Sequence, residues 1–157
     1  MKRLIAMIVV AAALPTAAQD ATKSTAVVSA SGAWTRATVP GQRGTGAFMT
    51  LTSATGARLV GAASPAAGVV EIHEMVMEGN VMKMRAVAGV DLPPGRSVEL
   101  GPGGYHVMLM DLKRPLATGD RVRIDLHLET RDRRMVTQPI DVEVRAAPPE
   151  KHGAHKH

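Results

Sequence analysis

The clearest structural signal in this chain lies in residues 121–144, RVRIDLHLETRDRRMVTQPIDVEV. Apolar and polar side chains alternate in both halves, with apolar ones at Val122, Ile124, Leu126 and Leu128 and again at Ile140, Val142 and Val144. A period of two residues is typical of a strand with one buried face, because successive side chains point to opposite sides of a sheet. The stretch therefore predicts two strands, over residues 121–129 and 135–144.

Runs of the same kind recur along the rest of the chain. Short segments rich in Val, Leu, Ile and Met are separated by Gly and Pro, and no segment has the 3.6-residue apolar repeat of an amphipathic helix. The further predicted strands cover residues 27–34, 46–52, 58–63, 69–77, 81–87, 97–100 and 105–110. We expect a single all-β domain, a sandwich or barrel, over residues 27–145.

The two ends of the chain differ from this domain. Residues 1–18 have the positive start, the apolar run at positions 4–14 and the small final residues of a cleaved signal peptide. We therefore expect export from the cytoplasm. The apolar run is shorter than the roughly 20 residues that a bilayer span needs, so we expect no stable membrane insertion. Residues 19–26 form a polar lead-in, and residues 146–157 form a flexible His-rich tail with His152, His155 and His157.

Composition excludes several classes of function. The chain has no cysteine, which rules out disulfides, iron–sulfur clusters, nucleophilic cysteine and blue-copper ligands. Loss of residues 1–18 lowers the net charge from +5 to +3, and the scattered basic residues lack stacking aromatics, so no nucleic-acid partner is expected. No nucleophile, zincin or phosphate-loop motif is present, and we do not expect an enzyme.

Methionine is concentrated in one part of the chain, with six of the ten residues between positions 75 and 110. A predicted hairpin holds five potential metal ligands on one face: His73, Met75, Met77, Met82 and Met84. A loop at residues 78–79 would place Met75 opposite Met82, whereas a loop at residues 79–80 would place it opposite Met84. Both registers keep the histidine and the four methionines on the same face.

A third predicted strand adds further donors of the same kind. In residues 105–110, His106, Met108 and Met110 share one face, while Val107 and Leu109 turn toward the core. Thioethers are soft ligands and imidazole is borderline, so this composition favours Cu(I), with Ag(I) as a mimic, over Mg, Ca or structural Zn. Neutral ligands leave the charge of Cu(I) unneutralised, and the ion should therefore remain transferable.

The spacing of these residues resembles that of the periplasmic copper chaperones called PCuAC. His73 is followed after ten residues by Met84, and after 21 more by His106-x-Met108. The segments AWTRA at 33–37, GAFM at 46–49, PPG at 93–95 and PGGYHVML at 102–109 are also similar to the family. The resemblance covers about residues 30–129 and implies a cupredoxin-like Greek-key β-sandwich with a Cu(I) site formed by His73, Met84, His106 and Met108.

The resemblance also implies an activity. PCuAC proteins carry Cu(I) in the periplasm and deliver it to the CuA centre of cytochrome c oxidase, so the implied partner is subunit II of that oxidase or a thiol-bearing chaperone. Met75 is a candidate alternate ligand or neighbour of the site. The tail histidines form either a solvated end or a second site for Cu(II), which imidazole without thioether favours.

Other interpretations of the methionine cluster stay open. Met fills irregular gaps well, so the cluster could be ordinary core, as is expected for Met49 and Met135. It could also be an exposed patch on a metal-free, immunoglobulin-like interaction module. A copper-sequestering resistance protein would share the metal site but not the delivery partner.

Overall fold

The structure is a computed structural model that describes residues 26–146. Ten strands and no helix are found in this part of the chain, which confirms the predicted all-β class. The strands are β1 (Ser29–Arg36), β2 (Gly44–Thr52), β3 (Ala57–Ala63), β4 (Ala67–Glu78), β5 (Val81–Ala86), β6 (Val90–Leu92), β7 (Ser97–Leu100), β8 (Tyr105–Leu112), β9 (Arg121–Thr130) and β10 (Met135–Arg145).

Both predicted terminal segments fall largely beyond this range. The signal peptide of residues 1–18, nearly all of the lead-in and the three tail histidines lie outside the described residues. Between residues 26 and 146 we find no helix with the length and apolar character needed to cross a membrane.

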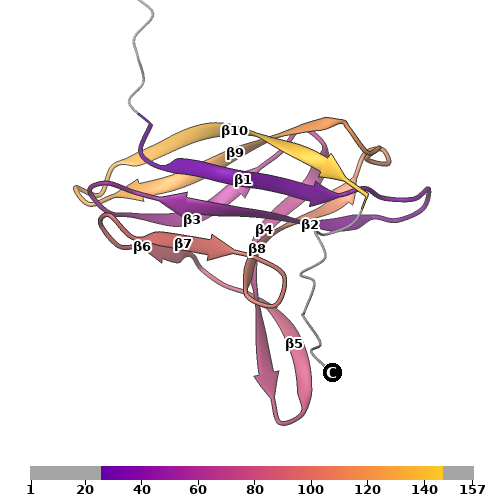
Figure 1. Cartoon of the computed structure of the whole chain (residues 1–157), viewed down its shortest axis with the longest axis horizontal. Helices are drawn as coiled ribbons and strands as arrows, with labels where there is room; N and C mark the ends of the chain where they lie inside the picture. The colour runs from indigo at the N-terminus through magenta and orange to yellow at the C-terminus, as the bar shows by residue number, and fades with distance from the viewer. Residues whose placement is uncertain (1–25, 147–157) are drawn as a thin grey trace, which may run out of the picture.

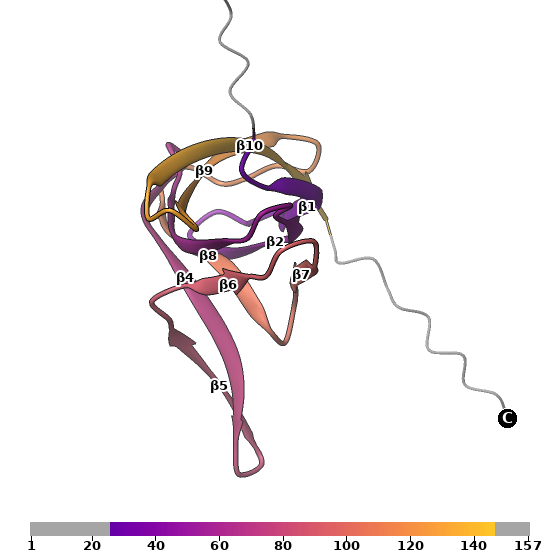
Figure 2. The same ribbon diagram turned by 90° about the vertical axis from the view of Figure 1, so that its left-hand side faces the viewer.

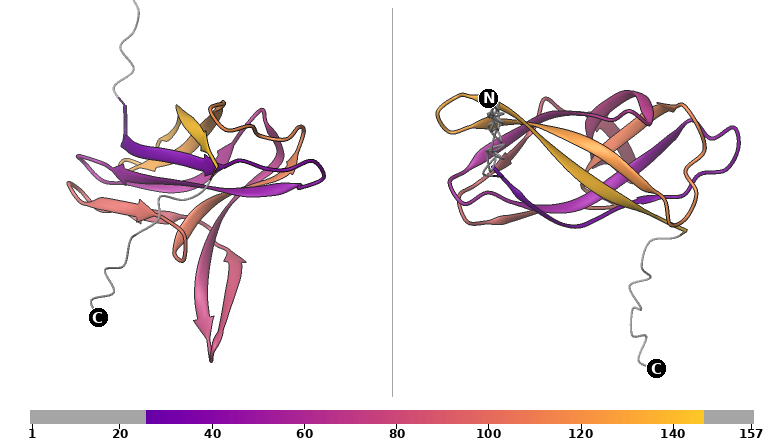
Figure 3. Two further views of the ribbon diagram at one scale, coloured as in Figure 1. Left: turned by 45° about the vertical axis from the view of Figure 1, so that its right-hand side comes forward. Right: turned by 90° about the horizontal axis from the view of Figure 1, so that it is seen from above.

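The strands form one sheet that curls back on itself. Their hydrogen-bonded order is β5-β4-β8-β2-β1-β10-β9-β3-β6, and β7 also pairs with β2. Only β1 and β10 run parallel among these pairs. Because β3 also packs against β4, the two halves of the sheet enclose a common core (Figures 1 and 2). The β4–β5 hairpin extends away from this body, as Figure 3 shows from a third side.

The core is built from aliphatic side chains at alternate strand positions. Six of the seven alternating apolar residues of β9 and β10 are at most 3% exposed, and Ile140 is partly buried; the six are Val122, Ile124, Leu126, Leu128, Val142 and Val144. Full burial of a side chain of this size contributes about 1.5–3 kcal/mol. In β8 the buried residues are Val107 and Leu109. Their inward orientation turns His106 and Met108 toward the opposite face of that strand.

The structure separates the two methionines that the sequence assigned to the core. Met49 of β2 is buried, but Met135 is 60% exposed, so the expectation for Met135 is wrong. Met135 lies opposite Glu129 of β9. That position alternates with the buried Leu128, and Met135 therefore shares the solvent-facing side of the two strands.

Candidate metal site

The β4–β5 hairpin carries the first group of predicted ligands. Its loop is formed by residues 79 and 80, so Met75 lies opposite Met84. Gly79 has a φ angle of +63°, and Asn80 is not among the described residues with positive φ. A glycine with positive φ at the first loop position is the pattern of a type II′ hairpin turn. Of the two predicted registers, the structure has the one that pairs Met75 with Met84.

The two faces of this hairpin differ in chemistry. One face carries the five predicted donors, which are His73, Met75, Met77, Met82 and Met84. The other face carries two ion pairs, one between Glu74 and Arg85 and one between Glu78 and Lys83, each with an N–O distance of 2.5 Å. An exposed pair such as Glu78–Lys83 stabilises a fold by only about 0–1 kcal/mol. Strand alternation nevertheless keeps their charges off the thioether face.

Strand β8 brings the second group of donors beside the hairpin. His106 lies directly opposite His73 of β4, and the centroids of the two rings are 5.9 Å apart in an edge-to-face arrangement. Two residues further along, Met108 lies opposite Glu71. The His73–His106 pair is therefore a cross-strand contact that residues 33 positions apart in the sequence make through sheet pairing.

Each histidine ring has one nitrogen engaged by an oxygen acceptor. His106 Nδ1 donates to the Gly104 carbonyl oxygen at 3.2 Å, and His73 Nε2 donates to Glu71 Oε2 at 2.7 Å. Because these oxygens can only accept, a neutral ring in either place keeps a lone pair on its other nitrogen. His73 Nδ1 is the one buried side-chain nitrogen or oxygen within residues 26–146 that has no hydrogen-bond partner. Engagement of one ring nitrogen by a carboxylate or carbonyl is typical of metal-binding histidines.

Three of the four predicted ligands line a common cavity of about 420 Å³, together with the alternate ligand Met75. These four lining residues are Met75, Met84, His106 and Met108. Phe48 of β2 forms part of the wall, with its ring centroid 6.1 Å from that of His106. His73 is not part of the lining but packs against His106 at its edge. The other clustered methionines, Met77, Met82 and Met110, lie outside the lining.

Two glycines of β2 make room for side chains at this site. A Cβ atom on Gly44 would lie 3.2 Å from Met108 Cε, and one on Gly46 would lie 2.9 Å from Phe48 Cζ. The Met108 methyl group and the Phe48 ring therefore occupy space that other residues would fill. Neither glycine, nor Glu71, is among the predicted site residues. The sequence could have identified Glu71 as a neighbour of the site, because it lies two positions before His73 on the same strand face.

Burial controls the charge of His106, which is only 5% exposed. Desolvation lowers the pKa of His106 below its ordinary value of 6.5. The hydrogen bond with the Gly104 carbonyl acts in the opposite direction, and the neighbouring His73 adds a smaller lowering. A lowered pKa keeps the imidazole neutral near pH 7, which is the form that can donate an electron pair to a metal.

The donors gathered here are two imidazoles and three thioethers, which bind metal ions as neutral ligands. Such a set is suited to a soft monovalent cation and poorly suited to hard cations that require oxygen ligands. Within the described residues no group of three His, Asp or Glu side chains is placed to hold a metal ion. Within the described residues, the further soft donors that line the cavity beside His106 are the thioethers of Met75, Met84 and Met108.

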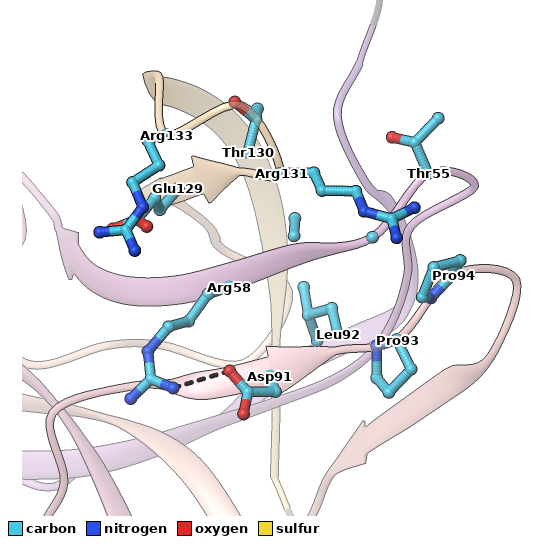
Figure 4. Close-up of a pocket in the computed structure, with 12 residues that line it drawn as sticks. Thr55, Arg58, Asp91, Leu92, Pro93, Pro94, Glu129, Thr130, Arg131 and Arg133 are labelled. Atoms are coloured by element: carbon cyan, nitrogen blue, oxygen red, sulfur yellow. Dashed lines mark hydrogen bonds and ion pairs between the residues drawn. The ribbon is translucent and has the colours of Figure 1, made fainter.

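A second cavity, of about 360 Å³, has a different lining. It lies between the start of β3, strand β6 and the turn from β9 to β10, and its cationic residues are Arg58, Arg131 and Arg133 (Figure 4). Arg58 Nη1 pairs with Asp91 Oδ1 at 2.7 Å. The lining contains no histidine and no methionine. It thus lacks both kinds of donor that the predicted copper site requires.

Solved structures of PCuAC domains have the same fold as this chain. The apo PCuAC domain from PmoF1 superposes with a TM-score of 0.63 and 24% identity, covering 78% of this chain and 96% of that one. Apo-DR1885 from Deinococcus radiodurans gives a TM-score of 0.59 and 34% identity, over 94% of this chain and 97% of that one. The Cu(I) form of DR1885 gives a TM-score of 0.52 and 36% identity, over 83% of this chain and 86% of that one. The predicted cupredoxin-like β-sandwich is confirmed.

Sequence comparison identifies the family. Residues 28–140 match the family described as "Putative lipoprotein LpqE-like". The chain is also 34% identical to "Putative lipoprotein Lxx21020" of Leifsonia xyli subsp. xyli (strain CTCB07) over 128 residues, which cover 81% of this chain and 77% of that protein. With the family match and this relative in agreement, the chain belongs to the LpqE-like family and has the fold of PCuAC domains.

Proposed function

We propose that this protein is a copper chaperone that binds one Cu(I) through His73, Met84, His106 and Met108 and hands it to another protein. The observation that carries the proposal is the cross-strand histidine pair, in which oxygen acceptors engage one nitrogen of each ring beside a cavity lined by thioethers. A buried polar atom without a partner costs about 1–3 kcal/mol. A cation bound to His73 Nδ1 would remove that cost.

The exposure of the donors suits an ion that must leave again. His106 is buried at the inner end of the site, whereas Met84 is 48% exposed on the edge strand β5. An acceptor protein can therefore approach the ion from the Met84 side and displace the thioethers first. Met75, opposite Met84 on β4, is a fifth donor that can cover the ion or replace a lost ligand.

Copper as the cargo is supported by similar proteins. The Cu(I) form of DR1885, which is 36% identical, carries this support, whereas the copper-bound PCuAC domain from PmoF2, at 24% identity, supports the fold alone. The donor set of this chain independently favours the monovalent ion, because thioethers prefer Cu(I) to Cu(II). Both arguments lead to Cu(I) as the bound species.

We further propose that the protein acts in the periplasm, after removal of residues 1–18, and acts as a carrier rather than as an enzyme. The word lipoprotein in the names of its family and its relative favours a place in the cell envelope. The acceptor would be a copper-binding protein of that compartment, such as cytochrome c oxidase subunit II or a thiol-bearing chaperone.

An anaerobic Cu(I) titration of the untagged protein, in competition with a coloured chelator, tests this function. We expect one tightly held equivalent and no intense visible absorption, because Cu(I) has a filled d shell and the chain has no thiolate. A His73→Ala/His106→Ala variant should lose this equivalent. Failure to retain Cu(I), or an intense blue band on loading, would overturn the proposal.

A further inference from the structure

Two thioethers on the ligand face of the hairpin have no role in the site described above. Met77 of β4 and Met82 of β5 lie opposite each other near the hairpin tip and do not line the cavity. They are 63% and 45% exposed. Large apolar side chains at the end of a projecting hairpin gain little from burial, so their presence calls for another explanation.

The hydrogen-bond pattern of the hairpin brings these two side chains close together. Val87 N–H donates to the Ile72 carbonyl at 2.9 Å, which marks that pair as hydrogen-bonded. Antiparallel pairs alternate between hydrogen-bonded and non-hydrogen-bonded types. The Met75–Met84 and Met77–Met82 pairs are accordingly both of the second type, in which the Cα atoms are only about 4.5 Å apart and the side chains are closest.

The two methionine pairs follow each other along one face. Successive positions on the same face of a strand are about 7 Å apart, so the outer pair of Met77 and Met82 lies one step beyond the inner pair of Met75 and Met84. The charged groups of this region, Glu78 and Lys83, bind each other on the opposite face. The outer pair therefore offers sulfur with no carboxylate beside it, because Glu71, which shares this face of β4, lies beyond His73, three same-face steps from Met77.

We propose that Met77 and Met82 form a second, weaker site for Cu(I) or Ag(I), through which the ion enters and leaves the histidine site. This inference rests on the proposed function and deepens it. The ion moves by ligand exchange, in which its bonds to Met77 and Met82 break as bonds to Met75 and Met84 form. All four ligands are neutral and copper stays monovalent, so the step needs no electron or proton.

Binding at the outer site is tested by NMR of the full, untagged chain with ¹³C-labelled methionine methyl groups. Ag(I) is added stepwise as a redox-inert probe. We expect the first equivalent to shift the methyl signals of Met84 and Met108, and the second to shift those of Met77 and Met82. Methyl signals at Met77 and Met82 that stay unchanged through the second equivalent would refute the outer site.

Transfer is tested with the Met77→Leu/Met82→Leu variant and a matched control. Met135→Leu is the control, because it removes a thioether that is 60% exposed, nearly as exposed as Met77, on β10, far along the sheet order from the hairpin. Leu keeps nearly the same volume, so both variants should fold. We expect the double variant to hold its first Cu(I) within about twofold of wild type. We also expect it to release that ion to bathocuproine disulfonate at least about tenfold more slowly.

The outcomes separate the two proposals. If the wild-type protein does not bind the first equivalent of Cu(I), the chaperone function itself is refuted. Normal first-equivalent binding with equal release rates in wild type and double variant refutes only the relay through Met77 and Met82. An equal slowing in Met135→Leu also refutes the relay, because the effect would then not depend on the hairpin.

Discussion

From the hydrogen bond between Glu71 and His73 we predict how much the negative charge of Glu71 contributes to the affinity for Cu(I). We consider the change Glu71→Gln, which keeps an oxygen acceptor for His73 Nε2–H but removes the negative charge. The acceptor oxygen is 2.7 Å from Nε2. A cation on Nδ1 would lie about 2 Å from that nitrogen, on the other side of the ring. Together with the width of the ring, this places the carboxylate roughly 7 Å from the cation.

The size of the effect follows from this distance. Two unit charges at roughly 7 Å attract each other by about 0.6 kcal/mol in bulk water and by about 2.4 kcal/mol at an effective dielectric constant near 20. The Glu71 side chain is 45% exposed, so solvent screens part of this attraction. An intermediate loss of about 1.4 kcal/mol corresponds to a tenfold weaker Cu(I) complex.

Competition titration with a Cu(I) chelator measures the change directly. The matched control is Glu74→Gln, which removes a carboxylate from the same strand but from the opposite face, where it pairs with Arg85. We expect the control to bind Cu(I) within about twofold of wild type. If Glu71→Gln behaves like the control, the Glu71–His73 bond does not support a metal ligand, and the assignment of His73 as one is wrong.

Three further predictions concern the donors, the tail and the pH response. Met84→Leu and Met108→Leu should each weaken Cu(I) binding at least about tenfold, while Met110→Leu, outside the cavity lining, should change it little; chelator competition compares the three. Truncation after Ala147 should weaken Cu(II) binding and leave Cu(I) binding intact, and separate titrations with the two ions would measure both. Equal loss of Cu(II) and Cu(I) binding would mean that the tail supplies ligands to the histidine site. Burial lowers the pKa of His106 in the folded domain, whereas in the unfolded chain the same histidine takes up a proton below about pH 6.5. The contribution of His106 to stability is therefore present above that pH and is lost as the pH falls toward the folded-state pKa. Denaturant unfolding of the metal-free protein between pH 7.5 and 5 would detect this loss, and an imidazole NMR titration with a His106 midpoint at or above 6.5 would contradict it.

The sequence was most informative where one strand face is fully buried. Alternation placed β9 and β10 within a residue of their observed bounds, and the core-facing Val107 correctly implied that His106 lies on the opposite face of β8. Strand β6 (Val90–Leu92) was not predicted, because three residues are too few to show a period. Met135 was misassigned because apolar character alone does not say which face of β10 is buried.

The candidate site was only partly readable for a related reason. Two loop positions around Gly79 give the same facial pattern, so only the backbone pairing decides that Met75 faces Met84. The His73–His106 contact depends on β4 and β8 being neighbours, which no local pattern encodes. The resemblance to PCuAC selected four of eight periodic donors, and the cavity holds three of those four together with Met75.

Strand β5 differs from the core strands in how its side chains contribute to the folding free energy. All six of its residues are exposed, and its one partner in the sheet is β4. Side chains on β5 can therefore change during evolution with little cost in folding free energy, since such surface changes usually stay within about 0.5 kcal/mol. Met84 lies on this strand, while His106 and Met108 lie on β8 next to the buried core residues Val107 and Leu109. In the proposed copper site, selection can thus adjust how readily the metal is released by varying β5 alone, without disturbing the residues that form the core.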